Sequence, residues 1–204
     1  GGMGDMVLLL PVLNRLRAQF PGASLDLVCE RRNMEVLRLA GLSSHAIAYD
    51  ASPFRLIRRL FREKYDVAID TEQFHNLSAV LSFLDSAPVR IGFKINPNRN
   101  LLYTHLVNYA MDDYEGMQFM RLLAPLNVSD LSYRLEGALV ATDGFTDKTM
   151  SSVEAIFPKE PFVVIYPGST TIYKKWDTER FCELAHVLED KRGLSVALVG
   201  GREA

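Results

Sequence analysis

Phe162-Val-Val-Ile-Tyr166 and Leu194-Ser-Val-Ala-Leu-Val199 are short runs of apolar and β-branched residues, and a stretch of helical spacing lies between them at residues 178–191. The apolar residues of that stretch recur every three or four positions, which predicts an amphipathic helix. Arg192-Gly193 follows it, and glycine commonly ends a helix. A strand, a helix and a second strand in this order predict a βαβ unit with parallel strands. The chain is therefore predicted to be an α/β protein.

The same alternation runs through the earlier part of the chain. Four more short apolar runs are predicted strands, at residues 24–29, 46–49, 66–69 and 89–93. Residues 53–64 form the clearest helical pattern, with arginines off its apolar face. That predicted apolar face consists of Phe54, Ile57, Leu60 and Phe61. These elements predict a further parallel sheet with helices between its strands.

Residues 128–160 interrupt this rhythm with Pro158, an Asp-Gly pair and other turn residues. We therefore predict two Rossmann-like domains, one at residues 1–158 and the beginning of a second at residues 159–204. The glycine-rich start of the chain is typical of a turn that follows a strand, and the last predicted strand leads into a glycine pair. We expect the chain to be an internal fragment, with a first strand before it and the rest of the second domain after it.

The composition excludes several classes of protein. The chain has 204 residues, of which 48% are hydrophobic and 24% are charged, as in an ordinary globular protein. A formal net charge of −2 argues against sequence-independent binding of nucleic acid. Cys29 and Cys182 are far apart, so we expect two buried structural thiols and a reducing compartment. No apolar run approaches the roughly 20 residues of a membrane span, and no secretory signal is visible. A cytoplasmic protein is predicted.

A carboxylate follows the glycine-rich start, in Gly1-Gly-Met-Gly-Asp5. Gly4 is predicted to let the backbone turn, which places Asp5 at the N-cap or in the first turn of a helix. Asp5 can simply cap that helix. Because parallel sheets bind ligands at the carboxyl ends of their strands, Asp5 can also accept a proton from a substrate hydroxyl. Both roles stay open, and Pro11 predicts a kink or the start of the regular helix.

A polar loop, Tyr166-Pro-Gly-Ser-Thr-Thr-Ile-Tyr-Lys-Lys-Trp176, leads to the helix that begins near residue 178. A helix N-terminus favours anions, and this loop adds a close backbone approach, hydroxyls and positive charge. It is a candidate phosphate-binding loop, and the alternative is a solvated polar loop. Neither a Walker loop nor a Gly-x-Gly-x-x-Gly motif is present. The candidate residues are Gly168, Ser169, Thr170 and Lys174.

Asp70-Thr-Glu-Gln-Phe-His75 follows the predicted strand at residues 66–69. It should place Asp70 and Gln73 at the ligand-binding edge, although capping and hydrogen bonds within the loop are an alternative. The arginine-rich helix at residues 53–64 can attract an anionic acceptor or an acidic membrane surface, or simply be solvated. The four histidines show no metal-ligand spacing and no Cys-x-x-Cys is present, so we expect no metal site.

Three motifs together resemble the heptosyltransferase family of inverting glycosyltransferases, glycosyltransferase family 9. The first is Gly1-Gly-Met-Gly-Asp5 followed by Pro11. The second is Tyr65-Asp-Val-Ala-Ile-Asp70 followed by Ala87-Pro-Val-Arg-Ile-Gly-Phe93. The third joins Pro167-Gly-Ser and Lys174-Lys-Trp176 to Glu179-Arg-Phe181 and Val199-Gly-Gly201.

The resemblance implies a GT-B fold, in which two Rossmann-like domains bind the acceptor and the nucleotide sugar. It implies that Asp5 deprotonates the acceptor hydroxyl and that Lys174 steadies the donor phosphates, with Gly168, Ser169 and Thr170 also at the donor. Gly4, Asp70 and Gln73 would lie on the acceptor side. The implied substrates are an ADP-heptose donor and a lipopolysaccharide-core or related glycan acceptor, with no metal and no resident cofactor.

The chain departs from the family at one of these motifs, since Asp70-Thr-Glu-Gln-Phe74 replaces the usual Asp-Leu-Gln-Gly, which leaves the acceptor open. The implied enzyme is cytoplasmic and can touch the inner membrane peripherally, and the fragment alone is expected to be inactive. Two alternatives stay open beside the transferase. One is a noncatalytic nucleotide- or glycan-binding module, and the other is a nucleotide-sugar hydrolase or epimerase.

Overall fold

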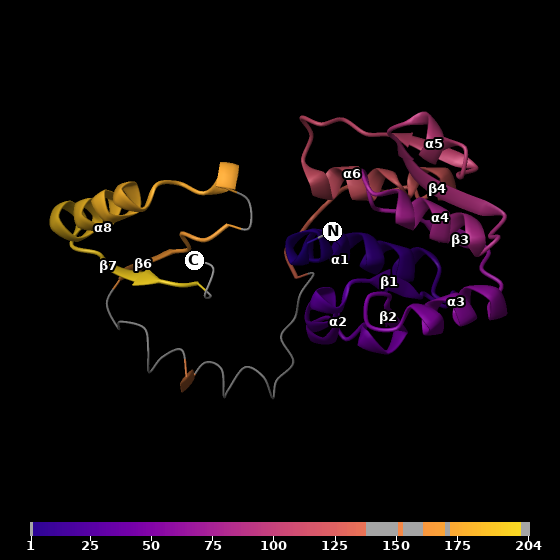
Figure 1. The fold of residues 1–204 in the computed structure, drawn as a ribbon, viewed down its shortest axis with the longest axis horizontal. Coiled ribbons are helices and arrows are strands. Elements are labelled where there is room, and N and C mark those ends of the chain that lie inside the picture. Colours follow the sequence, from indigo (N-terminus) through magenta and orange to yellow (C-terminus); the bar gives the residue numbers. More distant parts are fainter. Residues whose placement is uncertain (1, 138–150, 153–160, 170–171, 201–204) are drawn as a thin grey trace. The chain divides into compact units, whose positions relative to one another are not determined.

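The structure is a computed structural model that describes residues 2–137, 151–152, 161–169 and 172–200. The chain divides into two compact units, Gly1–Ala141 and Thr142–Ala204. The predicted domain boundary between residues 158 and 159 lies outside the described residues and stays a prediction (Figure 1).

The first unit alternates helices with strands (Figure 1). Its helices are α1 (Met3–Gln19), α2 (Met34–Leu39), α3 (Pro53–Arg62), α4 (Asn76–Leu84), α5 (Pro97–Asn100) and α6 (Glu115–Arg121). Its strands are β1 (Leu27–Cys29), β2 (Ala46–Ala48), β3 (Val67–Ile69), β4 (Val89–Lys94) and β5 (His105–Asn108). Single turns of 3-10 helix occur at Arg31–Asn33, Ser43–His45 and Ala124–Leu126.

All strand pairs of the first unit are parallel among the residues described. β1 pairs with β2, and β3, β4 and β5 form a second sheet in that order. Ile91 in the central strand β4 lies opposite Ile69 of β3 and His105 of β5. The three strands of this sheet therefore end at one edge, and the chain segments that leave β3 and β5 meet there. The expectation of an α/β chain with parallel sheets is confirmed.

The core of the first unit lies between helix α1, the strands and helix α6. Leu10 and Leu13 from α1 join Ile91 and Phe93 from β4 and Phe119 from α6 in one cluster of buried side chains. Each such side chain contributes about 1.5–3 kcal/mol when it is removed from water. α1 runs as one helix through Pro11, which is itself buried, so the helix does not begin at the proline. α1 is therefore packed into the same core as α6 and β4.

The predicted apolar face of α3 is wrong in part. Leu56 and Leu60 are buried at 3% and 8% exposure and pack with Ile47 of β2. Phe54 and Phe61, which the prediction placed in the core with Leu60, are instead 85% and 71% exposed. Residues four apart stack on one helix face, so the leucine pair covers the strand while the aromatic residues form a neighbouring stripe.

The two thiols also differ from expectation. Cys29 in β1 is buried, as predicted, whereas Cys182 is exposed on the second unit. Burial, together with the negative charges of Asp50 and Glu30, raises the pKa of the Cys29 thiol to about 11. Only Cys29 is therefore a structural thiol of the expected kind.

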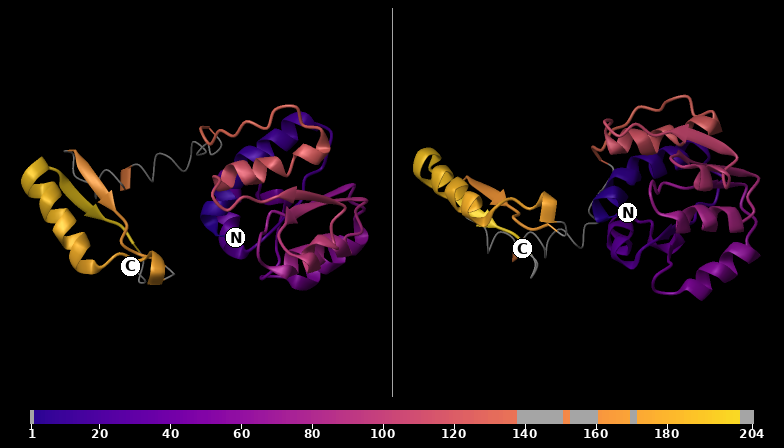
Figure 2. Two further views of the ribbon diagram at one scale, coloured as in Figure 1. Left: turned by 90° about the horizontal axis from the view of Figure 1, so that it is seen from above. Right: turned by 45° about the horizontal axis from the view of Figure 1, so that its top comes forward.

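The second unit is the predicted βαβ arrangement (Figure 2). Strand β6 (Phe162–Ile165) leads through a 3-10 turn at Ile172–Lys174 to helix α8 (Thr178–Arg192) and then to β7 (Ser195–Leu198). The two strands pair in parallel, with Val164 opposite Ala197. Gly193 has a φ of 60°, the left-handed conformation in which glycine ends a helix without strain, so the predicted helix end is confirmed.

Candidate functional site

Polar side chains from four segments gather at the carboxyl edge of the β3–β4–β5 sheet. Asp5 comes from the first turn of α1, and Gln73 from the loop after β3. Tyr109 follows β5, and Glu115 is the first residue of α6. Burial and the hydrogen bond and charge of Glu115 raise the pKa of Tyr109 to about 12, and the charge of Asp5 adds to this. Because the charge of Asp5 acts on Tyr109, the first turn of α1 lies within electrostatic range of this edge.

Asp5 lies in the first turn of α1, as one of its two predicted positions required. The predicted turn at Gly4 is absent, because α1 already begins at Met3 and Gly4 is part of the helix. The Asp5 carboxylate is exposed, and its Oδ2 accepts a hydrogen bond from the backbone N–H of Gly2 at 2.6 Å. A carboxylate can accept about four hydrogen bonds, so this capping contact leaves room for a ligand.

Gly4 does not form the predicted turn, but its lack of a side chain leaves space free beside α1. A Cβ built on Gly4 would meet no atom within 4 Å, so the space beside the first turn of α1 is open. An exposed carboxylate next to open space can be approached by a hydroxyl group. Asp5 therefore keeps both roles that the sequence allowed, the helix cap and the proton acceptor.

Glu115 bridges two side chains at this edge. One carboxylate oxygen of Glu115 accepts a hydrogen bond from the amide Nε2 of Gln73, and the other accepts from the hydroxyl of Tyr109 at 2.7 Å. The Tyr109 ring packs edge-on against Phe93 and Phe74, with ring centroids 5.1 and 6.4 Å apart. Because a carboxylate only accepts, the Gln73 amide is turned with its nitrogen toward Glu115, and its carbonyl oxygen is left for a hydroxyl donor.

Asp70 belongs to a buried ionic network behind this edge. Its side chain is 3% exposed, and Oδ2 accepts from the Tyr103 hydroxyl at 2.5 Å and from Arg99 at 3.1 Å. Burial raises the pKa of Asp70, and the hydrogen bonds from Tyr103, the Glu72 backbone and Ser78, with the charge of Arg99, oppose that rise. Arg99, 1% exposed, also donates to the backbone carbonyls of Glu72 and His75.

This network fixes the loop that carries Gln73. Arg99 bonds to the loop at its start, through Asp70, and at its end, through the carbonyl of His75 at 2.9 Å. Gly92 makes the packing possible, since a Cβ there would lie 2.4 Å from the Tyr103 ring. The sequence left two roles open for Asp70, contact with the acceptor or hydrogen bonds within the loop. These contacts favour hydrogen bonding within the loop.

The predicted phosphate loop lies in the second unit. Gly168 and Ser169 follow β6 and are half-buried, and Lys174 is exposed at the end of the 3-10 turn before α8. Trp176 packs edge-on against Phe181 with ring centroids 5.1 Å apart, which ties the end of the loop to the first turn of α8. Thr170 lies outside the described residues. The loop therefore leads to a helix N-terminus, where an anion is favoured.

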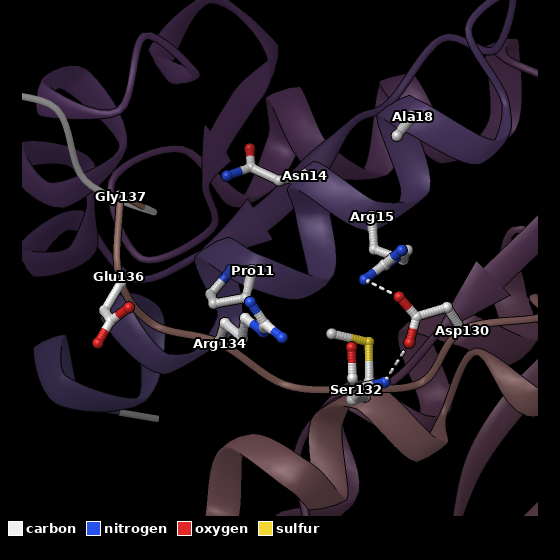
Figure 3. A pocket seen from close by; sticks show the side chains of 10 residues that line it. Pro11, Asn14, Arg15, Ala18, Asp130, Ser132, Arg134, Glu136 and Gly137 are labelled. Carbon is white, nitrogen blue, oxygen red and sulfur yellow. Dashed lines mark hydrogen bonds and ion pairs between the residues drawn. The ribbon is translucent and has the colours of Figure 1, made fainter.

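A separate hollow lies on the other half of α1 (Figure 3). It has a volume of about 440 Å³, and the ion pair of Arg15 with Asp130 spans it at 2.8 Å. None of the predicted site residues lines it. Its lining residues are Pro11, Asn14, Arg15, Ala18, Met120, Asp130, Ser132, Arg134, Glu136 and Gly137.

Sequence reasoning missed Arg99, Tyr103, Tyr109 and Glu115 as residues of this edge. Tyr109 and Glu115 follow β5, a strand that was not predicted, so nothing in the sequence brought them near Gln73. Among the described residues, no three His, Cys, Asp or Glu side chains are grouped as metal ligands would be. Within the same residues, no helix combines the length and apolar character that crossing a membrane requires.

The fold and the polar residues at the sheet edge define the class of protein to which this chain belongs. Parallel α/β units with polar side chains at the carboxyl ends of the strands are Rossmann-like ligand-binding folds. Residues 53–204 match the model of glycosyltransferase family 9 (heptosyltransferase), and the chain belongs to this family.

Individual relatives agree with this assignment. Lipopolysaccharide heptosyltransferase 3 of Escherichia coli K12 is 27% identical over 222 residues, which cover 98% of this chain and 61% of that protein. The crystal structure of a family 9 glycosyltransferase from Veillonella parvula superposes with a TM-score of 0.75 at 19% identity, covering 99% of this chain and 60% of that one.

Escherichia coli heptosyltransferase WaaC, solved with ADP, gives a TM-score of 0.65 at 20% identity over 98% of this chain and 64% of its own. In its complex with ADP-2-deoxy-2-fluoro heptose, WaaC gives 0.61 at 21% identity over 98% of this chain and 67% of its own. The chain has the α/β fold of these GT-B-type enzymes, and it spans about 60% of the length of the relatives.

Proposed function

We propose that the protein containing this chain transfers a heptose or a related sugar from an ADP-sugar to a lipopolysaccharide-core or related glycan acceptor. The observation that carries the proposal is the exposed Asp5 carboxylate, beside open space, at the strand edge of a family 9 chain. The names of the relatives support the substrates, since one is a lipopolysaccharide heptosyltransferase and WaaC was solved with an ADP-heptose analogue.

In the proposed reaction, Asp5 takes the proton of the acceptor hydroxyl. The acceptor oxygen then forms a bond to the anomeric carbon of the sugar while the bond from that carbon to the diphosphate breaks, which inverts the anomeric centre. ADP leaves with the negative charge, which Lys174 and the amides at the start of α8 would offset. Gly168, Ser169 and Thr170 would contact the donor. No resident cofactor takes part in this proposal, because the nucleotide sugar is a substrate.

The acceptor would bind at the edge that Gln73 and Glu115 form. The carbonyl oxygen of Gln73, which accepts no hydrogen bond from the residues that the structure describes, suits a sugar hydroxyl as its donor. The open space beside Gly4 gives the acceptor access to Asp5. The reaction would take place in the cytoplasm. Residues 1–204 by themselves are expected to release no ADP.

The test uses protein expressed from its complete reading frame, incubated with ADP-heptose and a lipopolysaccharide-core acceptor. Release of ADP that requires the acceptor supports the transferase, and Lys174→Ala should then raise the donor KM and lower kcat. ADP release without acceptor would instead indicate a hydrolase or epimerase. Donor binding with no release under any condition would contradict the transferase and support a noncatalytic module, in which Asp5 acts only through its hydrogen bond to Gly2.

A further inference from the structure

Glu115 holds the side-chain amide of Gln73 in one orientation. The Gln73 Nε2 donates to one carboxylate oxygen of Glu115, and the Tyr109 hydroxyl donates to the other at 2.7 Å. Because a carboxylate only accepts hydrogen bonds, the nitrogen of the Gln73 amide has to face Glu115, and the carbonyl oxygen faces away from it. That oxygen accepts no hydrogen bond from the residues that the structure describes, so it is available to a ligand.

Both sides of this bridge are fixed by further hydrogen bonds. The backbone N–H of Gln73 donates to the Glu72 carboxylate at 3.2 Å. Close to Glu115, the fully buried side chain of Gln118 donates to the backbone carbonyl of Ala110 and accepts from its N–H at 3.4 Å. This second pair of bonds closes the loop that joins β5 to α6. The direction of the Gln73 carbonyl is therefore set before a ligand binds, which lowers the cost of binding one.

The bridge and Asp5 act on the same tyrosine. Burial is the main cause of the raised pKa of Tyr109, and Glu115 and then Asp5 add to it, so Asp5 lies within electrostatic range of this ring. Phe74, directly after Gln73, is 57% exposed, and its ring packs edge-on against that of Tyr109 with centroids 6.4 Å apart. An exposed aromatic ring beside a hydrogen-bonding side chain suits a sugar, which has both apolar faces and hydroxyls.

We propose that Glu115 is a positioning residue that sets Gln73 to accept a hydrogen bond from a second, unreacting hydroxyl of the acceptor sugar, an inference that rests on the proposed function. Because a carbonyl oxygen only accepts, the acceptor needs a free hydroxyl at this contact rather than an ether or ester oxygen. An acceptor without that hydrogen would bring two oxygens together with no proton between them. Sites built to bond a substrate hydroxyl reject such analogues strongly.

The experiment measures the KM for acceptor and the KM for ADP-heptose separately. It uses protein expressed from its complete reading frame and, as acceptor, the core oligosaccharide released from lipopolysaccharide. Glu115→Ala removes the contact that holds Gln73 and should raise the acceptor KM about fivefold or more, with the donor KM unchanged. Gln73→Glu places two carboxylates against each other, neither of which can donate, and should raise the acceptor KM as much.

An exchange of the two side chains separates positioning from a general loss of structure. When Gln73→Glu is combined with Glu115→Gln, the new amide at position 115 donates to the new carboxylate at position 73, which keeps an oxygen for the acceptor. The acceptor KM should then return to within about threefold of that of the unchanged protein. The matched control combines Gln73→Glu with Glu35→Gln. It has the same net charge but loses the carboxylate of an exposed ion pair with Arg38, so its acceptor KM should stay high.

The inference is wrong if Glu115→Ala or Gln73→Glu leaves the acceptor KM unchanged, or raises the donor KM equally. It is also wrong if the exchange restores nothing, or if the Glu35→Gln control restores as much, since net charge would then be responsible. Calorimetric titration with the same oligosaccharide gives its Kd without turnover, and the Kd values should change in the same order. If the unchanged protein binds the oligosaccharide but releases no ADP, sugar transfer fails and these Kd values still decide the role of Glu115. No binding at all would overturn that role.

Discussion

Replacing Arg99 by methionine should destabilise the first unit far more than a substitution on its surface does. The ion pair with Asp70 has side-chain exposures of 1% and 3%, so removing the arginine leaves a carboxylate without its charge partner in the core. Breaking a buried pair in this way costs about 3–5 kcal/mol. That is about a fifth or more of the roughly 5–15 kcal/mol that stabilises a typical domain.

The matched control is Arg15→Met. Arg15 pairs with Asp130 at 2.8 Å, but the side chains are 31% and 51% exposed, and such pairs are worth about 0–1 kcal/mol. Hydrogen exchange of the β4 amides measures the opening of the first unit alone, so it compares the two variants directly. If Arg99→Met costs no more stability than Arg15→Met, the buried ion pair does not stabilise the first unit as proposed.

A second substitution separates the loss of the charge pair from the loss of packing. Adding Asp70→Leu to Arg99→Met removes the unpaired carboxylate, so the double variant should regain part of the lost stability. If the double variant is instead less stable than Arg99→Met alone, the unpaired charge of Asp70 is not what destabilises the single variant.

The remaining predictions concern single side chains of the first unit and the free thiols. At pH 8 a thiol with a pKa of about 11 is only about 0.1% thiolate. A thiol reagent should therefore modify the exposed Cys182 quickly and the buried Cys29 only after unfolding. Equal rates of modification would contradict the burial of Cys29. Glu115→Gln removes a charge that raises the pKa of Tyr109, so that pKa should fall from about 12, as followed by NMR of the ring carbons. An unchanged value would mean that the bridge is not formed. Leu60→Ala should lower the free energy of unfolding, measured by urea titration, by about 2–5 kcal/mol, and Phe61→Ala should lower it by less than about 0.5 kcal/mol. The reverse order would show that Phe61 lies in the core, as the sequence predicted.

Much of the fold follows from local sequence. The helix of the second unit ends where Gly193 predicts, and its two strands pair in parallel as a βαβ pattern requires. Strand β5 was not predicted, because His105-Leu-Val-Asn108 has only two apolar residues and is mostly exposed. Its strand conformation depends on pairing with β4, which a local pattern does not contain.

The face of α3 shows a second limit. The helical period predicts that apolar residues share a face, but α3 has two adjacent apolar stripes, and the period does not say which one meets the core. Contact with Ile47 of β2 decides this in favour of Leu56 and Leu60.

The candidate site was predictable where a residue directly follows a strand or begins a helix. Asp5 and Gln73 were identified on that basis, and both lie at the sheet edge. Arg99 and Glu115 were not, because their partners lie 29 and 42 residues away in sequence and only the fold brings them together. Burial of Asp70 likewise depends on Tyr103, 33 residues later.

The most direct test of the proposed chemistry is the kcat of Asp5→Asn in acceptor-dependent ADP release. Asparagine keeps a side-chain oxygen that can accept the hydrogen bond from the Gly2 N–H, so folding should change little, whereas loss of a general base should lower kcat by about 10²–10⁴-fold. A variant that folds normally and turns over within about threefold of the unchanged protein would show that Asp5 does no more than cap α1.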